Sequence, residues 1–263
     1  MKNAVFFDID GTLWDYCHSI PETTVRAVKE LQKNGGLAFI NTGRTLSTIQ
    51  EPELLEIGFD GIIGGCGTYI EYRGKELQNI LIPYDMLIKT RGIMKREHFW
   101  AFYEGVEDLY IDTEAFGDDP YAVSFQEKLG PHCKDDSELS PSSRINKFSI
   151  DYRESTADRV KASLGTMYDL IIHEFPGTHV SEIMPKGCSK GTAIKTICEK
   201  LDIDIKDTYA FGDSANDMGM LKSAGHGIAM GNGVDMVKNA AEYITTPIDQ
   251  DGIMNGLKHY GLI

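Results

Sequence analysis

The chain has 263 residues, of which 41% are hydrophobic and 25% are charged, and its 26 Lys and Arg against 40 Asp and Glu give a net charge of −14. This composition is typical of a globular protein and excludes a disordered, collagen-like or coiled-coil chain. The excess of acid argues against a protein that binds nucleic acid by neutralising many phosphates, but a small phosphorylated ligand needs only a local positive field.

A chain of this length forms one large domain or two, because a single core stops growing at roughly 250–300 residues. No apolar run reaches the roughly 18 residues of a membrane helix, and the apolar start is too short for a signal peptide. The cysteines form neither a C-x-x-C pair nor a zinc-ligand pattern, which favours reduced thiols in a cytoplasmic protein. They are Cys17, Cys66, Cys133, Cys188 and Cys198.

The N-terminal part has the pattern of a βαβ unit. Residues 4–7 form a continuous apolar run, which is typical of a strand buried on both faces. A helix with apolar residues on one side is predicted between Pro21 and Gly35, and residues 37–40 supply a second buried strand. This order of elements predicts an α/β fold with a parallel sheet.

The middle of the chain, from about residue 83 to residue 180, has denser turns and alternating strands. Residues 147–152 alternate between apolar and polar, which indicates an antiparallel sheet with one solvated face. Lys147 is interpreted as an ordinary exposed residue of that strand, and contact with the substrate from the insert is the alternative. The acidic run at residues 104–119 is interpreted as a solvated loop or edge, because clustered like charges usually lie in water. We interpret this segment as a domain inserted into the first.

The C-terminal part returns to the α/β pattern. It predicts a helix at residues 190–201, strands at 208–212, at 228–230 and near 244, and a closing helix at 252–260. Residues 1–82 and 181–263 would therefore form one discontinuous domain around the insert at 83–180.

Two acids follow the first strand directly, in the segment Asp8-Ile9-Asp10-Gly11-Thr12. Carboxylates two positions apart point to the same side of an extended chain, and Gly11 then lets the backbone turn. Ligands of open α/β sheets bind at the carboxyl ends of the strands, where this segment lies. The alternative is an ordinary Asp-Gly turn with solvated acids.

A second acidic segment, with Asp213 and Asp217, follows the strand that ends at Gly212. If a helix begins between these two acids, both can face one centre. Three or four carboxylates at one sheet edge would repel each other without a hard divalent cation. Mg²⁺ fits such oxygen ligands and is the predicted cofactor, although Mn²⁺ takes similar ligands.

Two further segments offer groups that bind anions. Thr42-Gly43-Arg44 follows the second strand and presents a hydroxyl and open backbone N–H groups, unless Thr42 only caps a helix. Lys190 lies at a predicted helix start, where it opposes the helix dipole at a cost of roughly 0.3–1 kcal/mol. A surface lysine could tolerate that cost, but a fixed positive charge between a nucleophilic acid and a phosphate would explain it.

Together, these four segments in this order at strand ends resemble the haloacid dehalogenase (HAD) superfamily of phosphatases. The insert between Thr42 and Lys190 and the spelling Ser189-Lys190-Gly191 resemble its Cof-type branch. The resemblance implies a Rossmann-like, HAD-like core with an inserted α+β cap domain that supplies substrate selectivity. One departure is Gly64-Gly65-Cys66-Gly67, where relatives commonly have an Asn-Gly-Ala-like turn.

The resemblance also implies roles for the site residues. Asp8 would attack phosphorus and form an aspartyl-phosphate, and Asp10 would act as general acid and base. Mg²⁺ would be held by Asp8, by the backbone carbonyl of Asp10 and by Asp213, with Asp217 as a ligand or just behind the ligands. The implied phosphate-binding residues are Gly11, Thr42, Gly43, Arg44, Lys190 and Asn216.

The sequence thus predicts a Mg²⁺-dependent phosphatase that acts on sugar phosphates or similar small metabolites, with no nucleic-acid or membrane partner. A phosphomutase of the same superfamily is an alternative, because an aspartyl-phosphate can pass its group to a second sugar. A receiver-type phospho-switch is another, but it would be a smaller single domain without the second acid, Asp10. Trp14 either contacts the substrate or packs its loop onto the core. The Gly-rich segment 230–233 is interpreted as a turn.

Overall fold

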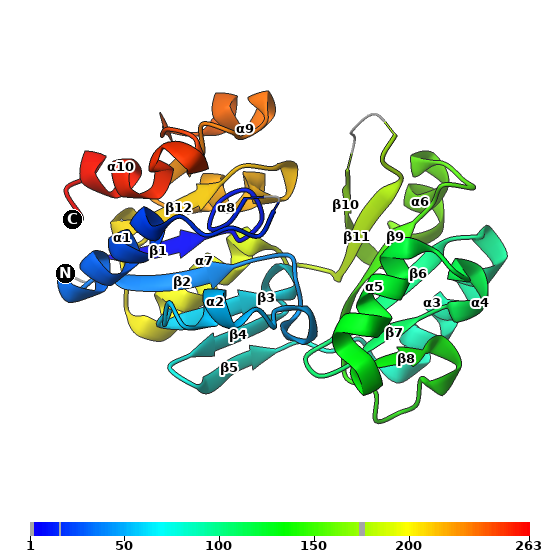
Figure 1. Ribbon diagram of the computed structural model, residues 1–263. Coiled ribbons are helices and arrows are strands. Elements are labelled where there is room, and N and C mark those ends of the chain that lie inside the picture. Colours follow the sequence, from blue (N-terminus) through cyan, green and yellow to red (C-terminus); the bar gives the residue numbers. More distant parts are fainter. Residues whose placement is uncertain (1–2, 16, 174–176) are drawn as a thin grey trace. The chain divides into compact units, whose positions relative to one another are not determined.

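The computed structural model describes residues 3–15, 17–173 and 177–263 (Figure 1). The chain divides into two compact units, of which the first comprises Met1–Gly43, Glu51–Leu77 and Ser189–Ile263 and the second comprises Arg44–Gln50 and Gln78–Cys188. The units join at Leu77/Gln78 and at Cys188/Ser189, whereas the sequence places the joints at 82/83 and 180/181, and Arg44–Gln50 belongs to the second unit. Its Thr45 hydroxyl donates to Glu104 Oε2 of that unit at 3.4 Å.

The first unit contains a sheet with the strand order β14-β13-β12-β1-β2-β3-β4-β5. Neighbouring strands from β14 to β3 run parallel, and β4 is antiparallel to β3. The central strand β1 lies between β12 and β2, which places the start of the chain beside its C-terminal third. The strands are β1 (Ala4–Phe7), β2 (Leu37–Asn41), β3 (Gly61–Gly64), β4 (Tyr69–Tyr72), β5 (Lys75–Asn79), β12 (Thr208–Gly212), β13 (His226–Ala229) and β14 (Tyr243–Ile244).

Helices cover both faces of this sheet (Figure 1), and they are α1 (Glu22–Lys33), α2 (Pro52–Leu55), α7 (Lys190–Leu201), α8 (Met218–Ser223), α9 (Asp235–Ala240) and α10 (Gly252–His259). Phe6 and Phe39 share one core cluster with residues of α7, α8 and α9. Phe7 points to the opposite face and stacks on Phe211 at 5.2 Å, and Gly256 of α10 packs against the Phe211 ring. Burial on both faces explains why β1 is continuously apolar.

The second unit contains a sheet with the order β10-β11-β9-β6-β7-β8. The predicted antiparallel pairing holds for four of the five neighbouring pairs, whereas β7 and β8 run parallel. Its strands are β6 (Trp100–Gly105), β7 (Leu109–Ile111), β8 (Cys133–Asp135), β9 (Ile145–Asp151), β10 (Tyr168–Ile172) and β11 (Val180–Pro185), and its helices are α3 (Tyr84–Glu97), α4 (Thr113–Phe116), α5 (Pro120–Leu129) and α6 (Ala157–Leu164). Among the described residues, no helix is both long and apolar enough to cross a membrane.

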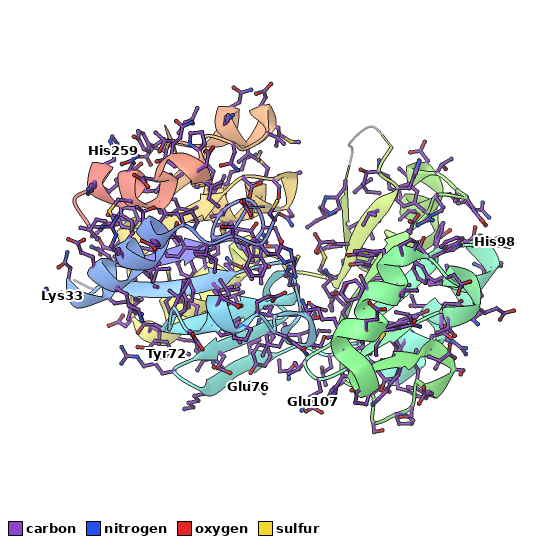
Figure 2. The ribbon with its side chains drawn as sticks, in the orientation of Figure 1. Lys33, Tyr72, Glu76, His98, Glu107 and His259 are labelled. Carbon is purple, nitrogen blue, oxygen red and sulfur yellow. The ribbon has the colours of Figure 1, made fainter. Side chains whose placement is uncertain are left out.

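The prediction that Lys147 is exposed is wrong, and the prediction of a solvated acidic run is wrong at Glu104. Lys147 was expected to be exposed and Glu104 to lie in a solvated run, yet their side chains are only 3% and 9% exposed. Lys147 Nζ lies 2.7 Å from Glu182 Oε2 and 3.5 Å from Glu104 Oε1, because β9 runs between β6 and β11. Burial raises the pKa of Glu104, whereas Lys147 and His173 outweigh burial and hold the pKa of Glu182 well below its usual value. Glu107, between β6 and β7, is exposed as expected (Figure 2).

Candidate active site

Three neighbouring strands end in polar residues. Asp8 directly follows β1, Thr42 follows β2 and Asp213 follows β12, and these strands run parallel side by side. The Asp8 N–H donates to the carbonyl of Phe211 at 3.0 Å, so the ladder between β1 and β12 continues into the acidic loop. The carboxyl edge of the sheet therefore gathers the three segments that the sequence singled out.

Helix α7 begins at Lys190, as predicted, and its first turn is held firmly. Ser189 caps it, because the Ser189 hydroxyl accepts the Thr192 N–H at 3.0 Å while the Thr192 hydroxyl accepts the Ser189 N–H at 2.9 Å. From β2, the Asn41 amide donates to the Lys190 carbonyl at 3.0 Å. These bonds fix the backbone from which the lysine side chain extends.

The Lys190 ammonium group lies at the centre of the site. Its Nζ is 2.7 Å from both Asp8 Oδ1 and Asp217 Oδ1 and donates to Asn216 Oδ1 at 3.3 Å, and the side chain is 1% exposed. Burial alone would lower the pKa of Lys190, but Asp217 and Asp8 outweigh it and raise that pKa well above its usual value. Lys190 is therefore a fixed positive charge next to Asp8.

Three buried carboxylates, those of Asp8, Asp213 and Asp217, each place one oxygen within 4.8 Å of the other two. Burial and the charge of Asp217 raise the pKa of Asp8 well above its usual value, although Lys190 opposes them. Burial and Asp217 likewise raise the pKa of Asp213 to about 7. Carboxylates that resist ionising together form a hard oxygen donor set, which fits a cation such as Mg²⁺.

Asp217 has contacts that distinguish it from the other two acids. Its Oδ2 accepts the backbone N–H groups of Asp213 at 2.9 Å and Ser214 at 3.0 Å, while Oδ1 binds Lys190. A 3₁₀ turn at Ala215–Asp217 leads into α8, so a helix does begin between the two acids. These contacts show that Asp217 closes its own loop and orients Lys190. The role of Asp217 in metal binding stays a prediction.

The turn after Asp8 depends on two residues to which no role was assigned from the sequence. The Thr12 hydroxyl donates to Asp213 Oδ1 at 3.0 Å, and the Asn232 amide donates to the Gly11 carbonyl at 2.8 Å. Asn232 also accepts the Ile248 N–H at 2.9 Å, so it links the first loop to the last third of the chain. Its Gly-rich segment signals a turn, but the sequence holds no sign of a partner 221 residues away.

The remaining predicted residues differ in their placement. Thr42 and Gly43 are buried, and the backbone of Thr42 is held by Ile63 at 2.9 Å and by the Cys66 N–H at 3.0 Å. The turn Gly64-Gly65-Cys66-Gly67, which departs from the family pattern, thus supports the backbone of Thr42. Arg44 lies in the second unit, so its contact with phosphate stays a prediction.

Comparison with known proteins decides the family. The sequence pattern of haloacid dehalogenase-like hydrolases matches residues 5–257. The chain belongs to this family. A Bacillus subtilis (strain 168) protein named "Putative phosphatase YkrA" is 31% identical over 267 residues, covering 100% of this chain and 99% of the relative. The HMP-PP phosphatase of Serratia proteamaculans (strain 568) is 26% identical over 290 residues, covering 99% and 96%.

The solved structure of a HAD subclass IIB sugar phosphatase is also similar, with a TM-score of 0.81, 25% identity, and coverage of 99% of this chain and 100% of that one. The predicted HAD membership and the α/β fold with a Rossmann-like core are thereby confirmed. The HAD chain is a hydrolase of the phosphatase type, as predicted. The family match covers nearly the whole chain, which excludes the alternative of a receiver-type switch, a smaller single domain.

Proposed function

We propose that this HAD phosphatase is Mg²⁺-dependent and hydrolyses small phosphate monoesters, such as sugar phosphates, through an aspartyl-phosphate on Asp8. The observation that carries the proposal is the position of the Asp8 carboxylate, which lies 2.7 Å from Lys190 and beside Asp213 at the carboxyl edge of the sheet. Relatives named as a sugar phosphatase and an HMP-PP phosphatase support a small phosphorylated substrate.

In the first step, an Asp8 oxygen would attack phosphorus while the bond from phosphorus to the leaving oxygen breaks and Asp10 gives that oxygen a proton. In the second step, Asp10 would take a proton from the water that attacks the aspartyl-phosphate, so that inorganic phosphate leaves and Asp8 is restored. Asp8 must be ionised to attack, and because burial and the charge of Asp217 raise its pKa, a further positive charge beside Lys190 would favour the ionised form.

When bound, Mg²⁺ would supply the positive charge that stabilises ionised Asp8 and the phosphoryl oxygens. Asp8, Asp213 and the backbone carbonyl of Asp10 would hold it. Lys190 and backbone N–H groups near Thr42 would stabilise the transferring phosphoryl group, and this kind of catalysis consists mainly of positioning and charge stabilisation.

The remaining predicted roles belong to the same proposal. Gly11, Gly43, Arg44 and Asn216 would complete the phosphate site, and residues 83–180 would act as a cap that selects the substrate. The five cysteines are free thiols, which supports a cytoplasmic location.

The test is a panel of phosphate esters assayed with Mg²⁺ and with EDTA. We expect EDTA-sensitive release of phosphate by the wild-type protein and a loss of at least about 10³-fold in kcat/KM for Asp8→Asn, because removal of a nucleophile leaves only binding and electrostatic catalysis. Wild-type protein without EDTA-sensitive hydrolysis of any ester would refute the proposal. Isomerised sugar phosphate in place of free phosphate would identify a phosphomutase.

A further inference from the structure

Trp14 is a large, fully buried residue in the loop that carries Asp10. Its side chain is 1% exposed, and its indole Nε1 donates a hydrogen bond to Asp10 Oδ1 at 3.0 Å. The sequence alone allows Trp14 either to contact substrate or to pack its loop onto the core. The observed bond points to another role, because it reaches the carboxyl group that would exchange protons during the reaction.

The backbone holds the indole in this place. The Ile9 carbonyl accepts the N–H groups of Leu13 at 2.9 Å and Trp14 at 3.2 Å, and the Gly11 N–H donates to the Trp14 carbonyl at 2.9 Å. This tight turn brings residue 14 back beside residue 10, which it pairs as an isolated bridge. The indole also stacks on the His18 ring, with 4.7 Å between ring centroids. The donor is therefore fixed before any substrate arrives.

The chemistry of the indole N–H suits a partner of a general acid. An indole nitrogen donates a hydrogen bond and cannot accept one, so Trp14 does not compete for the proton that Asp10 exchanges. In a protonated carboxyl group the carbonyl oxygen is the better acceptor. An N–H held at Oδ1 therefore favours the proton on Oδ2 and limits rotation of the carboxyl group.

We propose that Trp14 is a positioning residue for Asp10, holding Oδ1 so that Oδ2 gives the proton to the leaving oxygen and later takes one from water. This inference rests on the proposed function, in which Asp10 is the general acid and base. It goes beyond that function by assigning the orientation of Asp10 to a residue outside the metal and phosphate sites.

The test uses the substitution Trp14→Phe, which removes the N–H and keeps an aromatic ring. The constant kcat/KM would be measured for an alkyl phosphate, whose leaving group needs a proton, and for 2,4-dinitrophenyl phosphate, whose leaving group does not. We expect a loss of about 10- to 100-fold for the alkyl ester, which is part of the usual effect of a general acid, and a loss of less than about 3-fold for the dinitrophenyl ester.

A second readout measures the covalent intermediate itself and not the release of product. Because Asp10 would also activate the hydrolytic water, phosphorylated Asp8 should accumulate in Trp14→Phe during reaction with the dinitrophenyl ester. Mass spectrometry after acid quenching measures the phosphorylated fraction, which should exceed that of the wild type at least about 3-fold, because the base is misplaced in the second step.

Trp100 supplies the matched control, since it is the other of the two tryptophans and lies in the second unit with the Arg153 guanidinium 4.4 Å from its ring. Trp100→Phe should leave the ratio of kcat/KM for the two esters unchanged, and Asp10→Asn should change that ratio most. Thermal unfolding checks that Trp14→Phe is folded. If it is not, benzothienylalanine at position 14 replaces only the N–H with sulfur and serves as the second variant.

Equal losses on the two esters would assign Trp14 to packing alone and overturn the inference, as would no loss on either. The same difference in Trp100→Phe would also overturn it. Wild-type protein that hydrolyses neither ester would instead refute the proposed function, so the two failures are distinguishable.

Discussion

At the scale of single residues, the acid that would act as the nucleophile opposes folding. Asp8 is buried beside two other carboxylates, and its raised pKa shows that its charge is disfavoured in the folded protein without a cation. An acid whose folded-state pKa exceeds its unfolded-state pKa destabilises the protein at every pH above the unfolded value. The effect begins above the unfolded-state pKa of an aspartate and is therefore present at pH 7, so activity and stability make opposite demands at this position.

We therefore predict that Asp8→Asn raises the thermal unfolding temperature in EDTA at pH 7, by roughly 2–4 °C if it gains about 1 kcal/mol. The substitution removes a repelled charge, and Lys190 keeps Asp217 and Asn216 as acceptors. Scanning calorimetry in EDTA and in Mg²⁺ measures the effect, and Mg²⁺ should stabilise only the wild type.

The matched control for this prediction is Asp217→Asn. Asp217 accepts two backbone N–H groups through Oδ2, so its replacement should lower the unfolding temperature. A decrease in the Asp8→Asn protein as well would show that the contact with Lys190 outweighs the repulsion.

The residues that could be predicted from the sequence are those whose signal is local. Asp8, Asp213 and Lys190 each stand directly after a strand or at a helix start, and those positions can be recognised from neighbouring residues. Thr12 and Asn232 contribute through partners more than 200 residues away, which no local pattern reveals.

At the scale of elements, the turn between Asp8 and Trp14 requires glycine at position 11 for two separate reasons. Gly11 has a φ of +79°, a backbone conformation that L-residues other than glycine rarely adopt. A Cβ at this position would also lie 2.3 Å from Asp213 Oδ2. Backbone conformation and contact with a proposed metal ligand coincide at this one residue, so a substitution should affect both stability and metal binding.

We predict that Gly11→Ala lowers the free energy of unfolding by about 1–3 kcal/mol, and that Mg²⁺ affinity falls at least about 10-fold because Asp213 must move. Gly74→Ala is the matched control, since Gly74 has a φ of +74° and nothing within 4 Å of its Cβ position. Gly74→Ala should lower the free energy of unfolding through its backbone conformation alone and leave Mg²⁺ affinity unchanged. Denaturant titration and calorimetric Mg²⁺ titration measure the two quantities, and equal losses of affinity in both variants would contradict the prediction.

Elements were predictable where the pattern within one segment determines them. Residues 4–7 form β1 and residues 190–201 form α7 as expected, because both patterns report burial of the segment itself. The parallel pairing of β7 with β8 and the burial of Lys147 depend on which strands become neighbours. The alternation along β9 indicates that the strand has two different faces. It does not predict which strands become its neighbours, and therefore not that acids on β6 and β11 flank Lys147.

At the scale of the whole molecule, each of the two units has its own apolar core. Asp8, Lys190, Asp213 and Asp217 all belong to the first unit, although more than 180 residues separate Asp8 from Lys190. The parallel order of β12, β1 and β2 gathers them at one edge, so an insert between β5 and α7 leaves their arrangement to the core sheet. The acids follow strand ends on both sides of the insert. The sequence therefore predicts that the two flanking segments form one domain.

The net charge of −14 has a consequence for how an anionic substrate would approach. When ionised, the four acids of the site exceed Lys190 by three charges, and a divalent cation would still leave one negative charge. A phosphate ester is therefore attracted only at short range and repelled at long range. The Debye length falls from about 30 Å at 0.01 M salt to about 8 Å at 0.15 M, so salt removes the long-range part first.

We predict that kcat/KM for a dianionic phosphate ester rises roughly 2- to 5-fold between 0.01 M and 0.15 M sodium chloride at constant free Mg²⁺, because screening weakens the repulsion. Initial rates at low substrate concentration measure this dependence. An ester that carries an ammonium group has a smaller net charge and should show a smaller rise, which separates screening from a general effect of salt on the enzyme. A decrease in kcat/KM with salt would instead mean that positive groups around the phosphate site dominate the approach, despite the acidity of the whole chain.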